Sequence, residues 1–243
     1  MNLLLLEPDQ LSAEGVIRLA GPQARHVLTV LGTVPGDEVR VGLLNGPLGR
    51  GRVVATRDDS VDLLCTFDST IQEPPRVDLL LALPRPKVLR RLWSQLAALG
   101  VGQIILTNAA RVERNYFDTH VLTAACYRPL LIEGLQQARD TRLPSVSIHR
   151  QFRVLVEDDL DRLAPRASRL AAHPGDARTI ADVLRDRSAE RVLLAVGPEG
   201  GWNDFEVEML RAHGFVTAGL GTRTLRTDTA CVALIALVHE MIR

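Results

Sequence analysis

The first third of the chain consists of short apolar stretches separated by turn-forming residues. The predicted strands are 3–6, 38–44, 51–56 and 61–67. Apolar residues at helical spacing predict one short helix over 22–31. Turns at Asn45-Gly46-Pro47 and Asp58-Asp59-Ser60 separate the later strands. Several short strands at close spacing are typical of a small barrel or sandwich.

From residue 77 onward, continuous apolar runs alternate with stretches of helical periodicity. The predicted strands are 77–83, 103–106, 145–148, 168–172, 191–196 and 215–220. The predicted helices are 87–99, 119–139 with a bend near Pro129, 179–184, 204–212 and 228–241. This alternation predicts an α/β domain with a mostly parallel sheet. Pro74-Pro75 marks the boundary, so we expect domains at 1–73 and 74–243.

Composition indicates a folded protein, and the charge is unevenly distributed. The 243 residues are 46% hydrophobic, which argues against disorder, and 29 basic side chains balance 29 acidic ones. Residues 76–153 carry 12 basic and 5 acidic side chains, whereas the segments on either side are net acidic. A basic middle third suggests an anionic partner met by one face, although solvated arginines scattered over the surface are the simpler alternative.

Several classes of protein are not supported by the sequence. The three cysteines are far apart, so we expect no zinc site, no other metal site and no disulfide framework, as is usual in a reducing cytoplasm. The longest apolar runs, 79–83 and 231–238, are too short for a membrane helix, and the apolar start is too short for a signal peptide. Motifs of P-loop enzymes, zinc proteases and serine hydrolases do not occur.

Three loops follow predicted strands and contain residues that could bind a ligand; the first two follow the strands 191–196 and 168–172. The loop 196–202, Val-Gly-Pro-Glu-Gly-Gly-Trp, exposes backbone amides to a flat ligand, or is an ordinary turn before a helix capped by Asn203 or Asp204. His173, at the end of the strand 168–172, is either a ligand contact or a structural histidine. Open parallel sheets bind ligands beyond the carboxyl ends of their strands, where both of these loops lie.

The third loop, 220–230, places arginines at the start of a helix. Gly219-x-Gly221 lacks the third glycine of a dinucleotide fingerprint, so we do not predict a Rossmann site. Thr227 and Asp228 suit capping roles. Arg223 and Arg226 are disfavoured there by the helix dipole, which indicates either an anionic ligand or an ion pair with Glu199 or Asp228.

These three loops, in this order, resemble the bacterial 16S ribosomal RNA uridine-N3 methyltransferase family of the SPOUT superfamily. The motifs that carry the resemblance are Gly197 to Gly201, Leu225 to Ala230, His173-Pro174, Arg25 to Leu28, Pro35 to Asp37 and Asn45-Gly46. The chain departs from the family at Ala98, where a glutamate is frequent, and over 116–127, where a helix start rich in lysine and tryptophan is common. Arginine replaces most of the family's lysines.

The resemblance implies a PUA-like β-barrel followed by an α/β domain with a trefoil knot. It also implies S-adenosylmethionine as cofactor, 16S ribosomal RNA or the small ribosomal subunit as partner, a homodimer, no membrane and a cytoplasmic location. The implied cofactor residues are Ala172, His173, Gly197, Pro198, Glu199, Gly200, Gly201, Leu220, Gly221, Arg223, Leu225, Arg226 and Thr229. We expect RNA contacts from Arg25, Arg40, Arg50, Arg52, Arg85, Lys87, Arg90, Arg91, Arg111 and Arg114, because arginine forks suit phosphate oxygens.

For catalysis we expect Arg226 to stabilise charge on the uracil oxygens or to anchor a nearby phosphate. Glu199 and Asp228 are both candidate bases for the N3 proton. Two other functions stay open: a SPOUT enzyme with another target, such as a ribose hydroxyl in transfer RNA, and a non-catalytic RNA-binding module.

Overall fold

The computed structural model describes residues 3–12, 14–185 and 190–242 and divides into two compact units. The N-terminal unit holds the chain up to Pro74 together with Ile132–Leu143. The C-terminal unit holds Pro75–Leu131 and the chain from Pro144 onward. The division falls inside the helix α3 (Ala124–Ala138), so one segment of the middle of the chain packs with the first unit.

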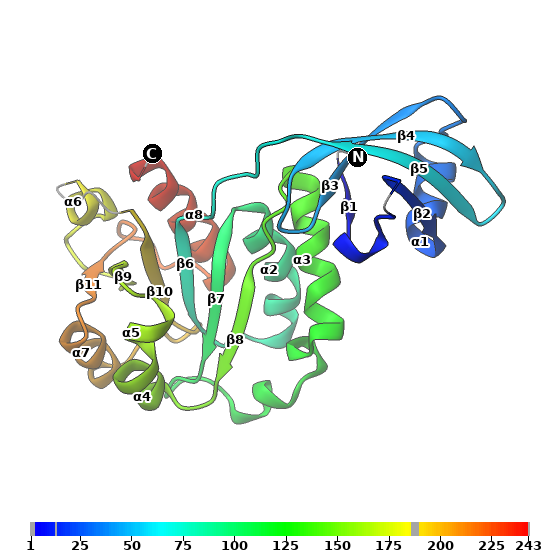
Figure 1. The fold of residues 1–243 in the computed structure, drawn as a ribbon. Coiled ribbons are helices and arrows are strands. Elements are labelled where there is room, and N and C mark those ends of the chain that lie inside the picture. The colour runs from blue at the N-terminus through cyan, green and yellow to red at the C-terminus, as the bar shows by residue number, and fades with distance from the viewer. Residues whose placement is uncertain (1–2, 13, 186–189, 243) are drawn as a thin grey trace. The chain divides into compact units, whose positions relative to one another are not determined.

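The N-terminal unit is built on a curled five-stranded sheet (Figure 1). Its strands, in spatial order, are β1 (Leu4–Leu6), β3 (Glu38–Leu43), β4 (Leu48–Thr56), β5 (Ser60–Phe67) and β2 (Val16–Ala20). β1 is parallel to β3 and the other pairs are antiparallel. β2 is an addition to the predicted strands. The predicted helix over 22–31 forms as α1 (Gly21–Arg25) and a π-helical turn (His26–Val30), and a 3-10 turn covers Pro8–Gln10.

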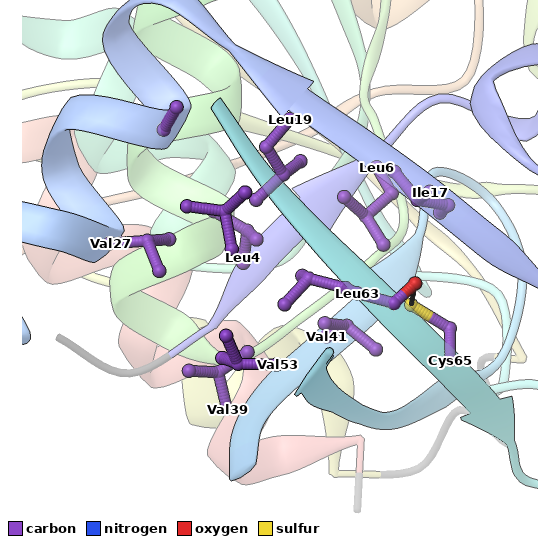
Figure 2. Packing of buried hydrophobic residues seen from close by; sticks show 12 residues of the cluster. Leu4, Leu6, Ile17, Leu19, Val27, Val39, Val41, Val53, Leu63 and Cys65 are labelled. Atoms are coloured by element: carbon purple, nitrogen blue, oxygen red, sulfur yellow. Dashed lines mark hydrogen bonds between the residues drawn. The ribbon is translucent and has the colours of Figure 1, made fainter. Parts of the chain in front are cut away.

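Alternation along these strands puts apolar side chains on one face, where they form the core of the unit. Figure 2 shows Leu4, Leu6, Ile17, Leu63 and their neighbours pointing toward one another from different strands. Each of these four side chains is at most 2% exposed, and they come from three different strands, β1, β2 and β5. The core therefore holds the curled sheet together.

On the opposite face of this sheet, the carboxylate of Asp62 pairs with two arginines. Asp62 accepts hydrogen bonds from Arg18 Nε at 2.7 Å and from Arg57 Nη1 at 2.8 Å. The donors on Arg18 and Arg57 lower the pKa of Asp62 to about 2. The strand pair β2–β5 places Arg18 directly opposite Asp62, so the register itself creates the ion pair.

The predicted turn at Asn45-Gly46 also binds the segment that follows α3. Thr141 is fully buried and donates from Oγ1 to the Gly46 carbonyl at 2.6 Å. Leu143 N donates to Asn45 Oδ1 at 2.9 Å. Asn45 has φ of 58°, a left-handed conformation that asparagine tolerates better than most residues. These bonds explain why Ile132–Leu143 belongs to the N-terminal unit.

The C-terminal unit contains a six-stranded, fully parallel sheet (Figure 1). Its spatial order is β11 (Val216–Ala218), β9 (Ser168–Ala172), β10 (Val192–Val196), β6 (Val77–Ala82), β7 (Val101–Thr107) and β8 (Ser145–His149). β6 and β10 are buried along their whole length, as expected of central strands. This sheet confirms the predicted α/β class.

Helices lie in the crossovers between the parallel strands, and a last helix follows β11. They are α2 (Pro86–Ala98), α3, a short helical series formed by α4 (Phe152–Val154), a π-helical turn (Leu155–Asp159) and α5 (Leu160–Leu163), then α6 (Ile180–Leu184), α7 (Asp204–Ala212) and α8 (Thr227–Met241). α8 packs against α2, α6, β6 and β10. No helix within the described ranges is long and apolar enough to cross a membrane.

The structure corrects the predicted boundaries at two places. The helix predicted over 119–139 begins at Ala124, after 3-10 turns at Arg114–Asp118 and His120–Leu122. In the second of these turns, the Val121 carbonyl accepts a hydrogen bond from the Trp93 indole at 3.3 Å. The strand predicted over 215–220 is shorter, because its last residues belong to the loop that is described below.

One buried ion pair joins the two central strands of the C-terminal unit. Asp78 on β6 is fully buried, and Arg191, just before β10, donates to its two oxygens at 2.5 and 2.7 Å. The hydrogen bonds that Arg191 donates to the Asp78 carboxylate raise the pKa of Arg191. Both oxygens of the buried carboxylate are therefore paired.

Candidate active site

Two of the three predicted loops run side by side because their strands are neighbours in the sheet. β9 lies between β10 and β11. His173 N donates to the Ala218 carbonyl at 3.0 Å, and Gly219 N donates to the Arg178 carbonyl at 2.8 Å. The loop after β9 and the loop after β11 are therefore joined by main-chain hydrogen bonds at both ends of the contact.

Gly219 allows this contact. A Cβ at this position would lie 2.5 Å from the Asp176 carbonyl oxygen, which is closer than real Cβ atoms come. Asp176 is itself held, because Thr217 Oγ1 donates to its carboxylate at 2.6 Å. This hydrogen bond, with further ones from Arg178, holds the pKa of Asp176 well below its usual range. Asp176 and Thr217 were not predicted as site residues, and only the pairing of β9 with β11 brings them together.

Between these loops and the start of α8 lies a small hollow of about 60 Å³. The predicted cofactor residues that line it are Ala172, His173, Leu220, Gly221, Arg223 and Leu225. Ala230 and Leu234 of α8 complete the wall. His173 Nδ1 is buried and has no hydrogen-bond partner within the described chain. The hollow thus offers apolar walls and one buried polar atom without a partner.

The third predicted loop, after β10, folds back on itself. Gly201 N donates to the Pro198 carbonyl at 2.8 Å, and Gly201 has φ of 72°. A Cβ on Gly197 would lie 3.0 Å from Trp202 N, so this position also favours glycine. Asn203 then caps α7: its side chain accepts from Glu206 N at 2.8 Å, and the Glu206 carboxylate accepts from Asn203 N at 2.9 Å. Of the two predicted caps, Asn203 is the one used.

Arg226 occupies the N-cap of α8 and makes no side-chain capping bond. Arg223 and Arg226 are exposed, and neither guanidinium has a hydrogen-bond or ion-pair partner among the described residues. The alternative that Arg226 pairs with Glu199 or Asp228 is therefore wrong within that part of the chain. Thr227 and Asp228 lie in the first helical turn, not at the cap where we had placed them.

The two candidate bases instead contact the arginine-rich start of α2. Asp228 Oδ2 accepts from Arg91 Nη2 at 2.9 Å, and Glu199 Oε1 accepts from Arg85 N at 3.1 Å. Arg111, after β7, donates to the Gly200 carbonyl. β6 neighbours β10 in the sheet, which brings the loop that precedes α2 beside the glycine-rich loop. The structure thus joins residues predicted for RNA contact with residues predicted for cofactor and catalysis.

The remaining predicted RNA contacts are exposed. Lys87 and Arg90 lie on α2, and Arg114 begins the 3-10 turn after β7. Thr229, a predicted cofactor residue, is also exposed, in the first turn of α8. In the N-terminal unit, Arg25 ends α1, and the register of β3 and β4 places Arg40 opposite Arg50 and Arg52 opposite Glu38. Arg50 pairs with Glu38 at 3.3 Å. Over the described residues, no cluster of histidine, cysteine or carboxylates could hold a metal ion.

Comparison with known proteins agrees with this geometry. The model of the RNA methyltransferase domain family matches residues 72–239. The ribosomal RNA small subunit methyltransferase E of Treponema pallidum is 28% identical over 251 residues, covering 98% of this chain and 90% of the relative. The Mycobacterium tuberculosis protein of the same name is 26% identical over 98% of this chain and 92% of its own length.

Solved structures share the whole fold. A ribosomal RNA small subunit methyltransferase E from Neisseria gonorrhoeae, bound to S-adenosyl methionine, has a TM-score of 0.81 at 23% identity and covers 99% of this chain and 98% of its own. A probable rRNA methyltransferase from Porphyromonas gingivalis has a TM-score of 0.79 at 21% identity, with coverage of 99% and 98%. The family expected from the three loops is confirmed, and this chain belongs to the RNA methyltransferase domain family.

Proposed function

We propose that this protein transfers the methyl group of S-adenosylmethionine to N3 of a uridine in the RNA of the small ribosomal subunit. The observation that carries the proposal is the juxtaposition at one edge of the parallel sheet. A hollow with apolar walls, a glycine-rich loop and two arginines without partners lie together there. The names of the small-subunit methyltransferases that match the whole chain support the RNA target.

The residues present fit the cofactor. Leu220, Leu225 and Leu234 provide apolar walls for a flat ring, and His173 Nδ1 is a buried polar atom free to bond it. The hollow of about 60 Å³ can enclose one end of the molecule, and Glu199 and Gly200 of the glycine-rich loop are exposed at the same edge of the sheet for the rest. When bound, the cofactor supplies an electrophilic methyl group. A solved relative bound to S-adenosyl methionine supports this choice.

We assign Arg226 to the uracil oxygens, where its free guanidinium would stabilise negative charge as N3 loses its proton. Glu199 is the better candidate for the base. The Asp228 carboxylate is already occupied by Arg91 at 2.9 Å, whereas Glu199 accepts only one backbone N–H and is exposed. General-base assistance contributes ~10²–10⁴-fold. Positioning can contribute more, with effective molarities of roughly 10⁵–10⁸ M.

The chain path supports the trefoil knot that the family resemblance implies. β11 lies at the edge of the sheet beside β9, yet α8, which follows it, packs against β10 and β6. Residues 219–226 must therefore pass back across the end of β9. The hydrogen bonds between the 173–179 loop and residues 218–219 lie along this crossing. A knotted crossing would hold the cofactor hollow without a disulfide or metal.

For the N-terminal unit we propose the PUA-like, RNA-binding role. Its curled sheet presents Arg40, Arg50 and Arg52 on one exposed face, where strand register makes them neighbours. Phosphate contacts by these arginines and by those near α2 predict RNA affinity that falls with salt. A cytoplasmic location follows from a ribosomal substrate.

A homodimer is supported by apolar side chains left exposed on α8. Leu237 is 44% exposed and Met241 is 36% exposed. Both line a second hollow of about 230 Å³, together with Ile180 and Leu220. A partner subunit that covers this surface would adjoin the cofactor loop at Leu220. Leu237→Asp should convert a dimer to monomers in sedimentation experiments, and an unchanged sedimentation coefficient would contradict this interface.

The assignment of Arg226 is tested with Arg226→Ala in methyl transfer to small-subunit RNA, followed by mass spectrometry of the product. We expect turnover to fall while the Kd for S-adenosylmethionine, measured by calorimetry, stays close to the wild-type value. Arg162→Ala, at an exposed arginine outside the site, is the matched control. Unchanged turnover in Arg226→Ala would refute its role. A methyl group found on a ribose or in transfer RNA, or no cofactor binding, would refute the proposed reaction.

A further inference from the structure

A third pocket, of about 250 Å³ and distinct from the two hollows described above, lies in the C-terminal unit beside the glycine-rich loop. It is formed by the loop after β7, the start of α7 and the start of α4. The lining residues that matter here are Asn108, Phe152, Arg153, Asn203, Phe205 and Glu206. Sites for drug-sized ligands usually occupy roughly 300–1,000 Å³, so this pocket suits a single small ring system.

Its most unusual feature is an aromatic side chain left in solvent. Phe205, in the first turn of α7, is 62% exposed. The opposite aromatic, Phe152, is buried and packs on Trp202 with ring centroids 5.4 Å apart. One aromatic is therefore fixed in the wall, while the other is free to stack on a planar ligand.

The polar groups of the pocket are mainly acceptors. Asn108 Oδ1 is buried without a hydrogen-bond partner among the described residues. Glu206 is 3% exposed, and its carboxylate accepts from Ala110 N at 2.7 Å and from Asn203 N at 2.9 Å. A buried carboxylate repels a phosphate, whereas an unpaired amide oxygen favours a ligand that donates an N–H. The interior therefore suits a neutral ring that carries an amino group.

The rim of the pocket carries one arginine, Arg153. Arg153 is exposed, and its Nε donates to Glu157 at 2.9 Å, which leaves the two Nη groups at the rim. Arg111 lies on the same β7 loop as Asn108 and donates to Gly200. An arginine at the rim and an unpaired amide oxygen inside match the anionic backbone and an amino-bearing base of a nucleotide.

The pocket is close to the proposed reaction centre. Asn203, in its wall, follows Gly201 by two residues. β10, β6 and β7 are successive strands in the sheet, and strands lie about 4.8 Å apart. The carboxyl ends of β10 and β7 are therefore roughly 10 Å apart, a separation that neighbouring unstacked nucleotides can span.

We propose that this pocket binds an unpaired base with an exocyclic amino group that flanks the target uridine, stacked on Phe205 and recognised by Asn108. The proposal rests on RNA being the substrate, and it assigns part of the selection of that RNA to a pocket separate from the cofactor loops.

Stacking is tested by titrating protein into a single-stranded heptanucleotide RNA that carries 2-aminopurine beside a uridine. We expect Phe205→Ala to weaken binding about fivefold to a hundredfold and to abolish quenching of the 2-aminopurine fluorescence. Phe205→Tyr should restore both. Val154→Ala, on α4 at an exposed apolar residue outside the pocket, is the control and should behave as the wild type. Equal affinity and quenching in Phe205→Ala would overturn the proposal.

Recognition by Asn108 is tested with two RNAs that differ only in one amino group, adenosine against purine riboside at the flanking position. The wild type should prefer adenosine, and Asn108→Ala should bind both alike. Equal binding by the wild type would overturn this assignment.

Methyl-transfer kinetics separate the two proposals. Phe205→Ala should raise KM for RNA about fivefold or more and leave kcat and cofactor affinity unchanged. If the wild type transfers no methyl group but shows quenching that depends on Phe205, the proposed function fails and the pocket stands. Normal methyl transfer with quenching retained in Phe205→Ala refutes the pocket alone.

Discussion

Gly219→Ala tests whether the contact between the loops after β9 and β11 shapes the cofactor hollow. The added Cβ would lie 2.5 Å from the Asp176 carbonyl oxygen, about 0.9 Å inside the 3.4 Å at which ordinary contact begins. The obstacle is a main-chain atom whose residue is held by Thr217 and by a hydrogen bond from Asp176 N to the His173 carbonyl. Backbone therefore has to move, and it moves at the wall of the hollow.

The size of the effect follows from this overlap. Overpacking of a closely packed site costs about 1–3 kcal/mol, which corresponds to a decrease in Tm of roughly 2–12 °C for a chain of this length. A displacement of about 1 Å near a reacting group can cost on the order of 10²-fold in rate. We therefore expect cofactor affinity or turnover to fall by about tenfold to a hundredfold.

Calorimetry with S-adenosylmethionine and thermal unfolding measure the two effects separately. Gly175→Ala is the matched control, because Gly175 lies in the same loop with φ of 84° and nothing within 4 Å of an added Cβ. That variant should lose stability through backbone strain and keep its cofactor affinity. If Gly219→Ala binds cofactor as the wild type does, the close contact does not shape the hollow.

Two further predictions concern stability. Asp78→Ala leaves the half-exposed Arg191 without its buried partner and should lower the unfolding free energy by about 1–3 kcal/mol in denaturant titrations, whereas Asp78→Leu combined with Arg191→Met should recover much of the loss. An Asp78→Ala variant as stable as the wild type would contradict the role of the pair. The pKa of Asp62 is lowered to about 2, against ~3.9 when unfolded. Its stabilising effect is therefore complete above about pH 4 and lost as pH falls toward 2. The stability difference between wild type and Asp62→Asn should shrink over that window in unfolding experiments, and a difference independent of pH would refute the assignment.

Periodicity was enough for most elements, because apolar spacing reflects which face of a strand or helix is buried. β6 and β10 were predicted as continuous apolar runs, since both of their faces are covered. The pattern was insufficient where a bond from a distant residue or a change of helical period accompanies an irregular backbone. The 3-10 turns before α3 depend on a bond from Trp93 to the Val121 carbonyl. The series α4 to α5 was not predicted, because its two short α-helical pieces are separated by a π-helical turn that interrupts the regular helical period.

The sequence predicted the loops of the candidate site but not the contacts that their residues make. Glycines and arginines at strand ends identified the loops along the chain. Their partners come from strands that are neighbours in space and distant in sequence. Asp228 pairs with Arg91 across 137 positions, and Glu199 contacts the Arg85 amide across 114 positions. No local pattern carries such pairings, and the alternative that Arg226 pairs with Glu199 or Asp228 was wrong.

The sequence by itself determined the α/β class, the loops that carry chemistry and the family, because each depends on residue type and short-range spacing. Only the tertiary structure decided which carboxylate is neutralised by an arginine, which arginine is left free, and that Phe205 is exposed beside an unpaired amide. The physical reason is the order of strands in the parallel sheet. It brings the ends of β9, β10 and β11 to one edge and sets β6 and β7 beside them, so long-range neighbours determine the contacts of Glu199 and Asp228.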